Sequence, residues 1–509
     1  MLQSFRPPCS VVFDYLKQDQ PLPAGMSPTT DHEPTEGRSV IGSLRKYPTK
    51  EVREEAQALG KIAGPLVIST LLILLRSLVS MIFLGRLGKL ELAGGSLALG
   101  FWNVTGNSVL KGLAMRMDPI CSQAFGAKNW SLLTLTFSRT IALLLLVSIP
   151  ITILWLNAES LLLRLGQDPE VARYAGVFMA TYVPELFAQS FLQPLRALLR
   201  TQGLTMPVTL ASLIALILHV PINYFLVIYM GLGIRGVALG LALNTMNLDL
   251  GLLIYIYTSK SPIKPWEHGY GVSFLSIFQD LQQLVAFAGP SCLSICSEWW
   301  WYNIMLVLCS RVGDSPESSI AAMGIMIQIC SYLYCIPFSL NSAALARVGN
   351  ALGAGRPCRA KLISIVGLVA SVAFGASVFA FATAARSKLA RIYTDEPTVI
   401  DLVTSTLPIL GLCELGNAPR TVASGVLMGT ARPELVARAN LCSFYVIGLP
   451  LTLLLAFKFE YGFKGLWLGL LASEISGTFM ISYDLRRTDW KYQAKRAEKL
   501  TLISGEKSD

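Results

Sequence analysis

Polar side chains that could carry a proton or bind a solute recur at helical spacing inside the most apolar parts of the chain. A helix places residues three and four positions apart on one face. The first such set is Ser291, Ser294, Glu298 and Tyr302, and the second is Glu414, Asn417, Thr421 and Ser424. Glu298 precedes a run of three tryptophans. Removal from water disfavours the charged form of a carboxyl group, as a reversible proton carrier requires. We predict a proton-coupling site at Glu298, which Glu414 shares if the two helical faces meet in one cavity.

Each of the two carboxylates also has a structural interpretation. Glu298 could be a carboxylate that a neighbouring hydroxyl satisfies, although the coupling role is favoured for it. Glu414 could lie near the membrane interface and only anchor its helix, and for this residue the two interpretations are equally open.

The first half of the chain carries its own polar sets within apolar segments. Asn103, Asn107 and Lys111 share one helical face, and Glu185 and Gln189 share another. The complete set of predicted substrate-cavity residues is Asn103, Asn107, Glu185, Gln189, Ser294, Tyr302, Gln328 and Thr421. Arg76 stands near the centre of the first apolar segment, where an unpaired guanidinium group is costly. We therefore predict a structural salt bridge from Arg76 to Glu185, while Glu185 also stays a cavity candidate.

Composition identifies the kind of protein in which these residues sit. Hydrophobic residues make up 53% of the 509 residues and charged residues only 15%, against about 25% charged residues in soluble domains. The net charge of +10 is concentrated in the two tails, and basic residues that flank apolar spans set membrane orientation, so nucleic-acid binding is the poorer explanation. The chain is predicted to be an integral membrane protein.

Several chemistries are not expected. The sequence has no CxxC pair and three widely separated histidines, so we predict no metal site and no cofactor. It also has no GxxxxGK[ST] loop for ATP and no nucleophile–base constellation, so we predict no catalytic residues and no enzyme activity.

Apolar segments of about 20 residues, each long enough to cross a bilayer, recur about twelve times. Their predicted centres lie near Leu72, Leu99, Leu145, Met179, Ile214, Leu243, Ile304, Ile329, Val372, Leu410, Leu453 and Leu471. An even number of spans and basic loops on the side of the tails predict that both tails are cytoplasmic. The predicted organisation is a disordered N-terminal tail (1–60), a six-helix lobe (61–258), a cytoplasmic linker (259–280), a second six-helix lobe (281–484) and a basic C-terminal tail (485–509).

The two halves of the chain repeat one another. Gly64-Pro65 and Gly289-Pro290 open the first and seventh spans, and Pro221 recurs as Pro450. Several matches in order at a steady offset indicate an internal duplication. Two six-helix halves with the same orientation around a central site are a transporter architecture.

Several motifs, in order, resemble those of plant multidrug and toxic compound extrusion (MATE) transporters of the detoxification type. These are Met117-Asp118-Pro119-Ile120-Cys121, Gln123-Ala124-Phe125-Gly126-Ala127, Pro194-Leu195-Arg196, Glu298-Trp299-Trp300-Trp301-Tyr302 and Gly416-Asn417-Ala418-Pro419. The resemblance implies an all-α, V-shaped bundle of twelve helices in two lobes that exports organic solutes in exchange for protons or sodium. It also implies a cation site made by a seventh-span Glu, which Glu298 matches, and a tenth-span Asp, where this chain has Asn417 with Glu414 one turn earlier.

The function predicted from sequence is a secondary antiporter that exports or sequesters small organic solutes in exchange for protons, with sodium as the other possible ion. Xenobiotics, hormones, secondary metabolites and organic acids all fit a wide, aromatic-lined cavity. The alternatives are a lipid-linked flippase of the same superfamily and a membrane scaffold or receptor that acts through its tails. We expect a monomer in the lipid bilayer of the plasma membrane, late endosome or vacuole, with no nucleic-acid partner.

Overall fold

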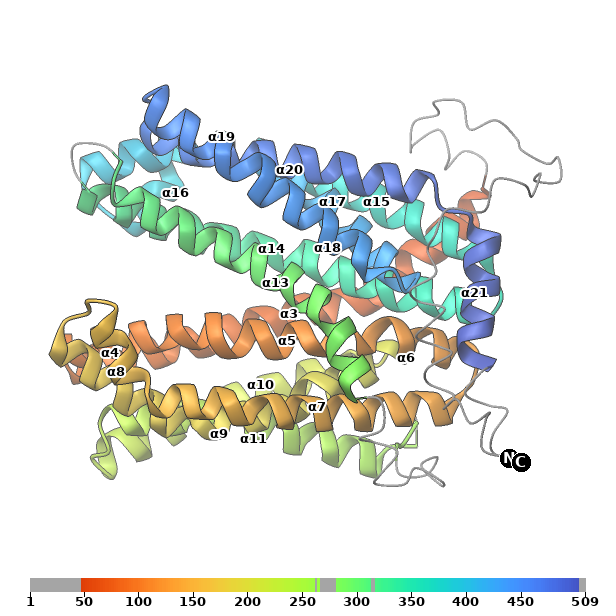
Figure 1. Ribbon diagram of the computed structural model, residues 1–509, viewed down its shortest axis with the longest axis horizontal. Helices are drawn as coiled ribbons and strands as arrows, with labels where there is room; N and C mark the ends of the chain where they lie inside the picture. Colours follow the sequence, from red (N-terminus) through yellow and green to blue (C-terminus); the bar gives the residue numbers. More distant parts are fainter. Residues whose placement is uncertain (1–46, 261–262, 266–280, 313–315, 503–509) are drawn as a thin grey trace, which may run out of the picture.

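Long helices make up nearly all of the secondary structure in the computed structural model of the protein (Figure 1). The structure describes residues 47–260, 263–265, 281–312 and 316–502, and none of these residues forms a strand. A helix satisfies its backbone polar groups internally, which is the condition for crossing a bilayer. In the described part of the chain, nine helices are long and apolar enough to span a membrane.

The first lobe contains the helices that precede residue 260, with η marking stretches of π-helix. They are α3 (Thr49–Leu87), α4 (Lys89–Trp102), η1 (Asn103–Asn107), α5 (Ser108–Ala114), α6 (Met117–Gly126), α7 (Trp130–Leu156), α8 (Ala158–Arg164), α9 (Pro169–Thr201), α10 (Met206–Asn223), η2 (Tyr224–Tyr229) and α11 (Ile234–Thr258). The segments α4, η1 and α5 follow one another without a break and form a single rod.

The second lobe begins at residue 281 and repeats this plan. Its helices are α13 (Leu281–Cys309), α14 (Pro316–Gly353), α15 (Pro357–Ala384), α16 (Arg386–Tyr393), α17 (Pro397–Gly429), α18 (Pro433–Leu441), η3 (Cys442–Gly448), α19 (Leu449–Leu453), η4 (Leu454–Lys458) and α20 (Gly462–Arg486), after which α21 (Trp490–Leu502) follows. Each predicted span centre lies inside one of the helical segments of the two lobes.

The internal repeat is visible in the shape of the helices. Pro221 is followed by the π-helical stretch η2, and its counterpart Pro450 is followed by η4. Proline removes a backbone donor from the helix, so a local change in hydrogen bonding is expected near it.

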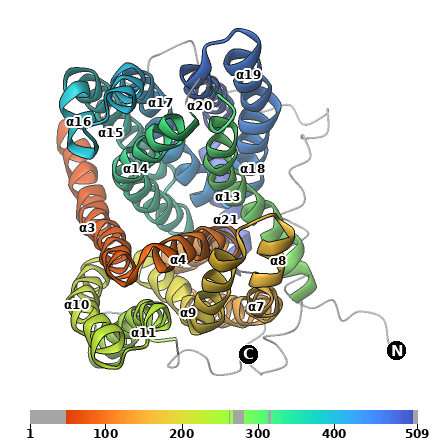
Figure 2. The same cartoon turned by 90° about the vertical axis from the view of Figure 1, so that its left-hand side faces the viewer.

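Figure 2 shows α13 to α20 in one group and α7 to α11 in another, with α3 along one side between them.

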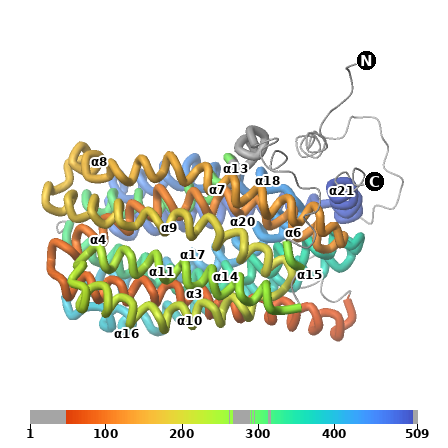
Figure 3. Tube along the Cα trace, turned by 90° about the horizontal axis from the view of Figure 1, so that it is seen from below, coloured from red at the N-terminus to blue at the C-terminus, as the bar shows by residue number. Residues whose placement is uncertain are grey.

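The two lobes are joined at one end of the bundle, which we call the tail end because it holds the start of α3, helix α6 and helix α21 (Figures 1 and 3). The buried Glu55 carboxylate of α3 accepts hydrogen bonds there from Arg347 Nη2 at 2.5 Å and Arg359 Nε at 2.6 Å. Gly353 of α14 lies so close to α6 that a Cβ atom on it would stand 2.0 Å from the Gln123 carbonyl oxygen. In Figure 1 the lobes diverge away from this end.

Two predicted boundaries differ from the structure. The N-terminal tail was predicted to extend to residue 60, whereas α3 begins at Thr49. The first turns of α3 are too polar to resemble a span, but the ion pairs of Glu55 hold them in place. Part of the predicted C-terminal tail is helix α21, which packs against α14 and α15 and accepts a 2.7 Å bond from Asn129 Nδ2 at the Thr501 carbonyl. Residues 1–46 of the predicted N-terminal tail, residues 503–509 and most of the predicted linker lie outside the described residues.

Each lobe has its own apolar core, and a third cluster joins them. Trp155 and Tyr182 are fully buried in the first core, and Trp301 and Trp467 in the second. The third cluster packs the start of α3 and helix α21 on α14 and α15 at the tail end. Each lobe is therefore built as a packed unit, and the tail end holds the two units together.

Candidate functional site

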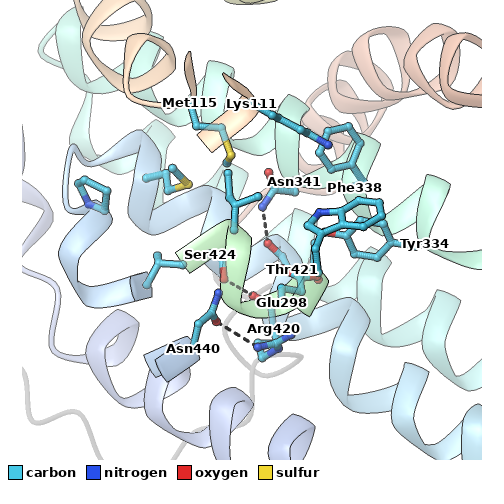
Figure 4. A pocket seen from close by; sticks show the side chains of 15 residues that line it. Lys111, Met115, Glu298, Tyr334, Phe338, Asn341, Arg420, Thr421, Ser424 and Asn440 are labelled. Carbon is cyan, nitrogen blue, oxygen red and sulfur yellow. Dashed lines mark hydrogen bonds between the residues drawn. The ribbon is translucent and has the colours of Figure 1, made fainter. Parts of the chain in front are cut away.

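A pocket lined mainly by the second lobe contains Glu298 (Figure 4). Helix α13 supplies Glu298 and Trp299, α14 supplies Tyr334 and Phe338, and helices α17 and α18 complete the wall. The first lobe contributes Lys111 and Met115 from α5, so the pocket lies between the lobes. We call it the larger pocket, to distinguish it from a smaller pocket within the first lobe.

The tryptophans that follow Glu298 on α13 face in different directions. Trp301 is fully buried in the core of the second lobe, with its ring centre 5.4 Å from that of Phe444. Trp299 is 38% exposed and lines the pocket beside the half-buried Glu298. The sequence prediction of a carboxylate among aromatic rings therefore holds for Glu298, although only part of the tryptophan run faces it.

Three residues of the second polar set, on α17, form a hydrogen-bonded chain that leads from the pocket into the lobe. Asn417 Nδ2 donates to both carboxylate oxygens of Glu414, at 3.3 and 3.1 Å. Thr421 Oγ1, which lines the pocket, donates to Asn417 Oδ1 at 3.1 Å. Glu414 is 2% exposed. The arrangement connects a buried carboxylate to the pocket through two neutral side chains.

A buried ion pair behind the pocket was not predicted from the sequence. Arg420 Nε lies 2.8 Å from Glu474 Oε2, and Arg420 Nη1 donates to Asn440 Oδ1 at 3.0 Å. Both charged side chains are 3% exposed. A signal for the pair exists, because an arginine and a glutamate inside two apolar segments of one half need each other as partners.

The predicted pair in the first lobe is confirmed. Arg76 Nη1 lies 3.8 Å from Glu185 Oε1. Thr245 bridges the two, since its hydroxyl accepts from Arg76 at 2.7 Å and donates to Glu185 at 2.9 Å. Gln189 Nε2 donates a 2.9 Å bond to the same carboxylate. The smaller pocket lies beside this network, and its lining includes Arg76, Gln189 and Arg196.

The predicted cavity residues do not converge on one site. Thr421 lines the larger pocket and Gln189 the smaller one, whereas the fully buried Glu185 lines neither. Asn103 and Asn107, which bond to each other at 3.3 Å in η1, also line neither, nor does Gln328 of α14. Tyr302 packs against the core of the second lobe, and the side chain of Ser294 lies outside the described residues.

A bound metal ion has no evident site among the residues that the structure describes. Among the described residues, no group of three or more His, Cys, Asp or Glu side chains is arranged to hold one. The larger pocket offers one ammonium group, one partly exposed carboxylate, the guanidinium group of Arg420 that is paired with Glu474, aromatic faces and neutral hydrogen-bonding groups.

Comparison with known proteins gives consistent matches. The MatE family model matches residues 65–225 and 290–454. Protein DETOXIFICATION 53 of Arabidopsis thaliana is 52% identical over 458 residues, which cover 90% of this chain and 93% of that protein. Protein DETOXIFICATION 49 of the same plant is 46% identical over 89% of each chain. The crystal structure of the eukaryotic MATE transporter AtDTX14 superposes with a TM-score of 0.82 at 31% identity, and the match covers 89% of this chain and 100% of that one.

Proposed function

The chain belongs to the MatE family of membrane transporters, and on that premise we propose that it exports or sequesters small organic solutes in exchange for protons. The observation that carries the proposal is the partly exposed carboxylate of Glu298 in a pocket between the lobes. A group that takes up and releases protons must be reachable by water and must act on the solute site. Glu298 is half-buried and lines the pocket that we propose as the solute site, which supports this role.

Proton coupling requires that protonation favours one arrangement of the lobes over the other. Glu298 belongs to the second lobe, and Lys111 of the first lobe lines the same pocket. Protonation of Glu298 removes a negative charge that faces the opposite lobe. The attraction between the lobes at the pocket then weakens, and the equilibrium between their arrangements shifts.

Glu414 is the candidate for a second proton-binding carboxylate. Its carboxylate accepts hydrogen bonds from the neutral amide of Asn417, whereas Glu474 is paired with Arg420. Glu414 can therefore gain or lose a proton without breaking an ion pair, and Glu474 cannot. The hydrogen bonds through Asn417 and Thr421 link Glu414 to the pocket.

The orientation proposed for the protein places the tail end in the cytoplasm. The basic residues of α21 and the first turns of α3 lie at this end, and positive charge beside spans favours the cytoplasmic side. We propose a monomer in the plasma membrane or in the late endosomal or vacuolar membrane. Sodium stays the alternative coupling ion.

The pocket gives less support to the alternative functions. A flippase for lipid-linked anions needs a strongly basic cavity. The larger pocket instead contains both the ammonium group of Lys111 and the carboxylate of Glu298, and its arginine is neutralised by Glu474. A scaffold that acts through its tails has no use for a chain of hydrogen bonds between a pocket and a buried carboxylate.

The test is a flux assay with purified protein in sealed vesicles under an imposed pH gradient. Three dyes are loaded separately: ethidium (cationic), 5-carboxyfluorescein (anionic) and esculin (an uncharged coumarin glucoside). We expect gradient-driven movement of at least one dye, abolished by a protonophore. Glu298→Gln should reduce that movement to the level of empty vesicles, because glutamine cannot release a proton. Movement of no dye, or normal movement in Glu298→Gln, would overturn the proposal.

A further inference from the structure

Lys111 is a charged side chain that the first lobe contributes to the lining of the larger pocket. It is carried by α5, which packs directly on α13 of the second lobe. The neighbouring residue is Gly112, where a Cβ atom would lie 2.7 Å from the Cα atom of Cys292. Only glycine allows this close approach of the two helices, and the approach delivers the Lys111 side chain into the pocket of the other lobe.

The Lys111 ammonium group lies over aromatic rings. Its Nζ atom is 4.3 Å from the ring centre of Phe338 and 5.9 Å from that of Trp299. No carboxylate oxygen of the described residues lies within 4.0 Å of this atom. A cation within about 6 Å of a ring centre is held by the quadrupole of the ring. A cationic group of a solute would otherwise bind on these ring faces. Lys111 occupies that position instead (Figure 4).

The charges that line the pocket also offset one another. Arg420 is paired with Glu474 behind the wall, which leaves Lys111 and Glu298 as one positive and one negative charge. The other polar groups of the wall are neutral, among them the hydroxyls of Tyr334 and Thr421. A pocket of this kind gives no net attraction to an ion, but it suits a ring that carries neutral hydrogen-bonding groups.

We propose that Lys111 sets the charge selectivity of the pocket by occupying the cation position on Phe338 and Trp299, so that the pocket selects uncharged aromatic solutes with hydrogen-bonding groups. This inference rests on the proposed function for its physiological meaning. It can nevertheless be tested by binding alone, without any proton gradient.

The experiment measures equilibrium binding of three bicyclic probes of similar size to the purified full-length protein in nanodiscs at pH 7. The probes are 2-naphthol (uncharged), 1-methylquinolinium (cationic) and 2-naphthoate (anionic). The wild-type protein should bind 2-naphthol at least about tenfold more tightly than 1-methylquinolinium, the ratio expected when a cation–π position is already occupied. Equal or tighter binding of 1-methylquinolinium by the wild type would overturn the proposal.

Variants separate the charge of Lys111 from its packing. Lys111→Met keeps an apolar stem and should raise affinity for 1-methylquinolinium about tenfold, because the ring faces become free while Glu298 keeps its negative charge. Lys111→Arg is the matched control and should retain the wild-type order of probes. The double variant Lys111→Met/Glu298→Gln should lose most of the gain. An unchanged probe order in Lys111→Met, with normal elution on size exclusion, would overturn the proposal.

The two proposals fail in different ways. If proton-driven flux is found but the cationic or anionic dye is preferred, only the selectivity role of Lys111 is wrong. If the probes bind in the predicted order but no dye moves with the gradient, only proton coupling is wrong.

Discussion

The two lobes treat their buried charges differently. In the first lobe, Arg76 and Arg196 line the smaller pocket, and the helices around that pocket also hold two buried carboxylates, Glu185 and Asp249, so the charges are equal in number. In the described part of the second lobe, three inner carboxylates (Glu298, Glu414 and Glu474) stand against Arg420. A balanced set can be held permanently, whereas a surplus carboxylate has to be protonated or offset from elsewhere. The comparison supports the proposal that the second lobe carries the titrating groups, with the first lobe as a fixed support.

The largest difference should come from matched removal of one carboxylate in each lobe. Glu414→Gln should weaken pH-gradient-driven flux nearly as much as Glu298→Gln while protein yield stays normal, because its Asn417 contact is not an ion pair. Glu185→Gln should do the reverse and lower yield while flux per molecule stays normal. Flux and yield are measured on the same preparations. If Glu414→Gln lowers yield but leaves flux per molecule and its pH profile unchanged, Glu414 is only an anchor.

Breaking the ion pair of the second lobe should strongly destabilise the protein. Arg420→Gln leaves the buried Glu474 without its cation, and removal of one partner of a buried pair costs about 3–5 kcal/mol. We expect a clearly lower midpoint of thermal unfolding in detergent. The control is Arg438→Gln, which removes a partly exposed pair with Asp484 and should have little effect. Equal midpoints for the two variants would contradict the prediction.

Neutralising both Arg76 and Glu185 should restore the expression that either single change lowers. Arg76→Gln and Glu185→Gln each leave one uncompensated charge, so each should lower expression. The variant with both changes has no unpaired charge from this pair and should recover much of the wild-type level. A double variant that expresses no better than the worse single variant would show that the two side chains do not act as a pair.

The smallest effect is expected for the bridge between those two residues. Thr245→Val removes a hydroxyl that accepts from Arg76 and donates to Glu185 but leaves both charges in place. The expected loss is about 1 kcal/mol of stability, typical of a hydrogen bond, measured as the unfolding midpoint. A loss as large as that of Arg76→Gln would mean that Thr245, and not the 3.8 Å ion pair, holds this part of the lobe.

Hydropathy is sufficient to locate the helices, because a bilayer forces long apolar segments to be helical. The pairing of Arg76 with Glu185 is also predictable, since the first span holds a single central cation that requires a carboxylate. By contrast, the sequence indicates that Arg420 needs a carboxylate, but the same half also holds Glu298 and Glu414. Its pairing with Glu474, 54 residues away, could therefore not be singled out. The start of α3 escapes prediction for a related reason, because it depends on Arg347 and Arg359, which are remote in sequence.

The predicted cavity shows the limit of helical periodicity. Periodicity correctly groups Glu414, Asn417 and Thr421, which form one hydrogen-bonded chain. It cannot show which neighbouring helix each face meets. Gln328 was predicted to line the cavity but lines neither pocket. Lys111, by contrast, reaches the larger pocket only because Gly112 brings α5 against α13.

The contact of Glu55 with Arg347 and Arg359 also sets an order of events during biosynthesis. Glu55 precedes these partners by 292 and 304 residues. At about 5–20 residues per second, the ribosome adds the first arginine roughly 15 to 60 s after the glutamate. Throughout that interval the Glu55 carboxylate has no ion-pair partner from the second lobe, so this contact between the lobes can form only after most of the chain has been made.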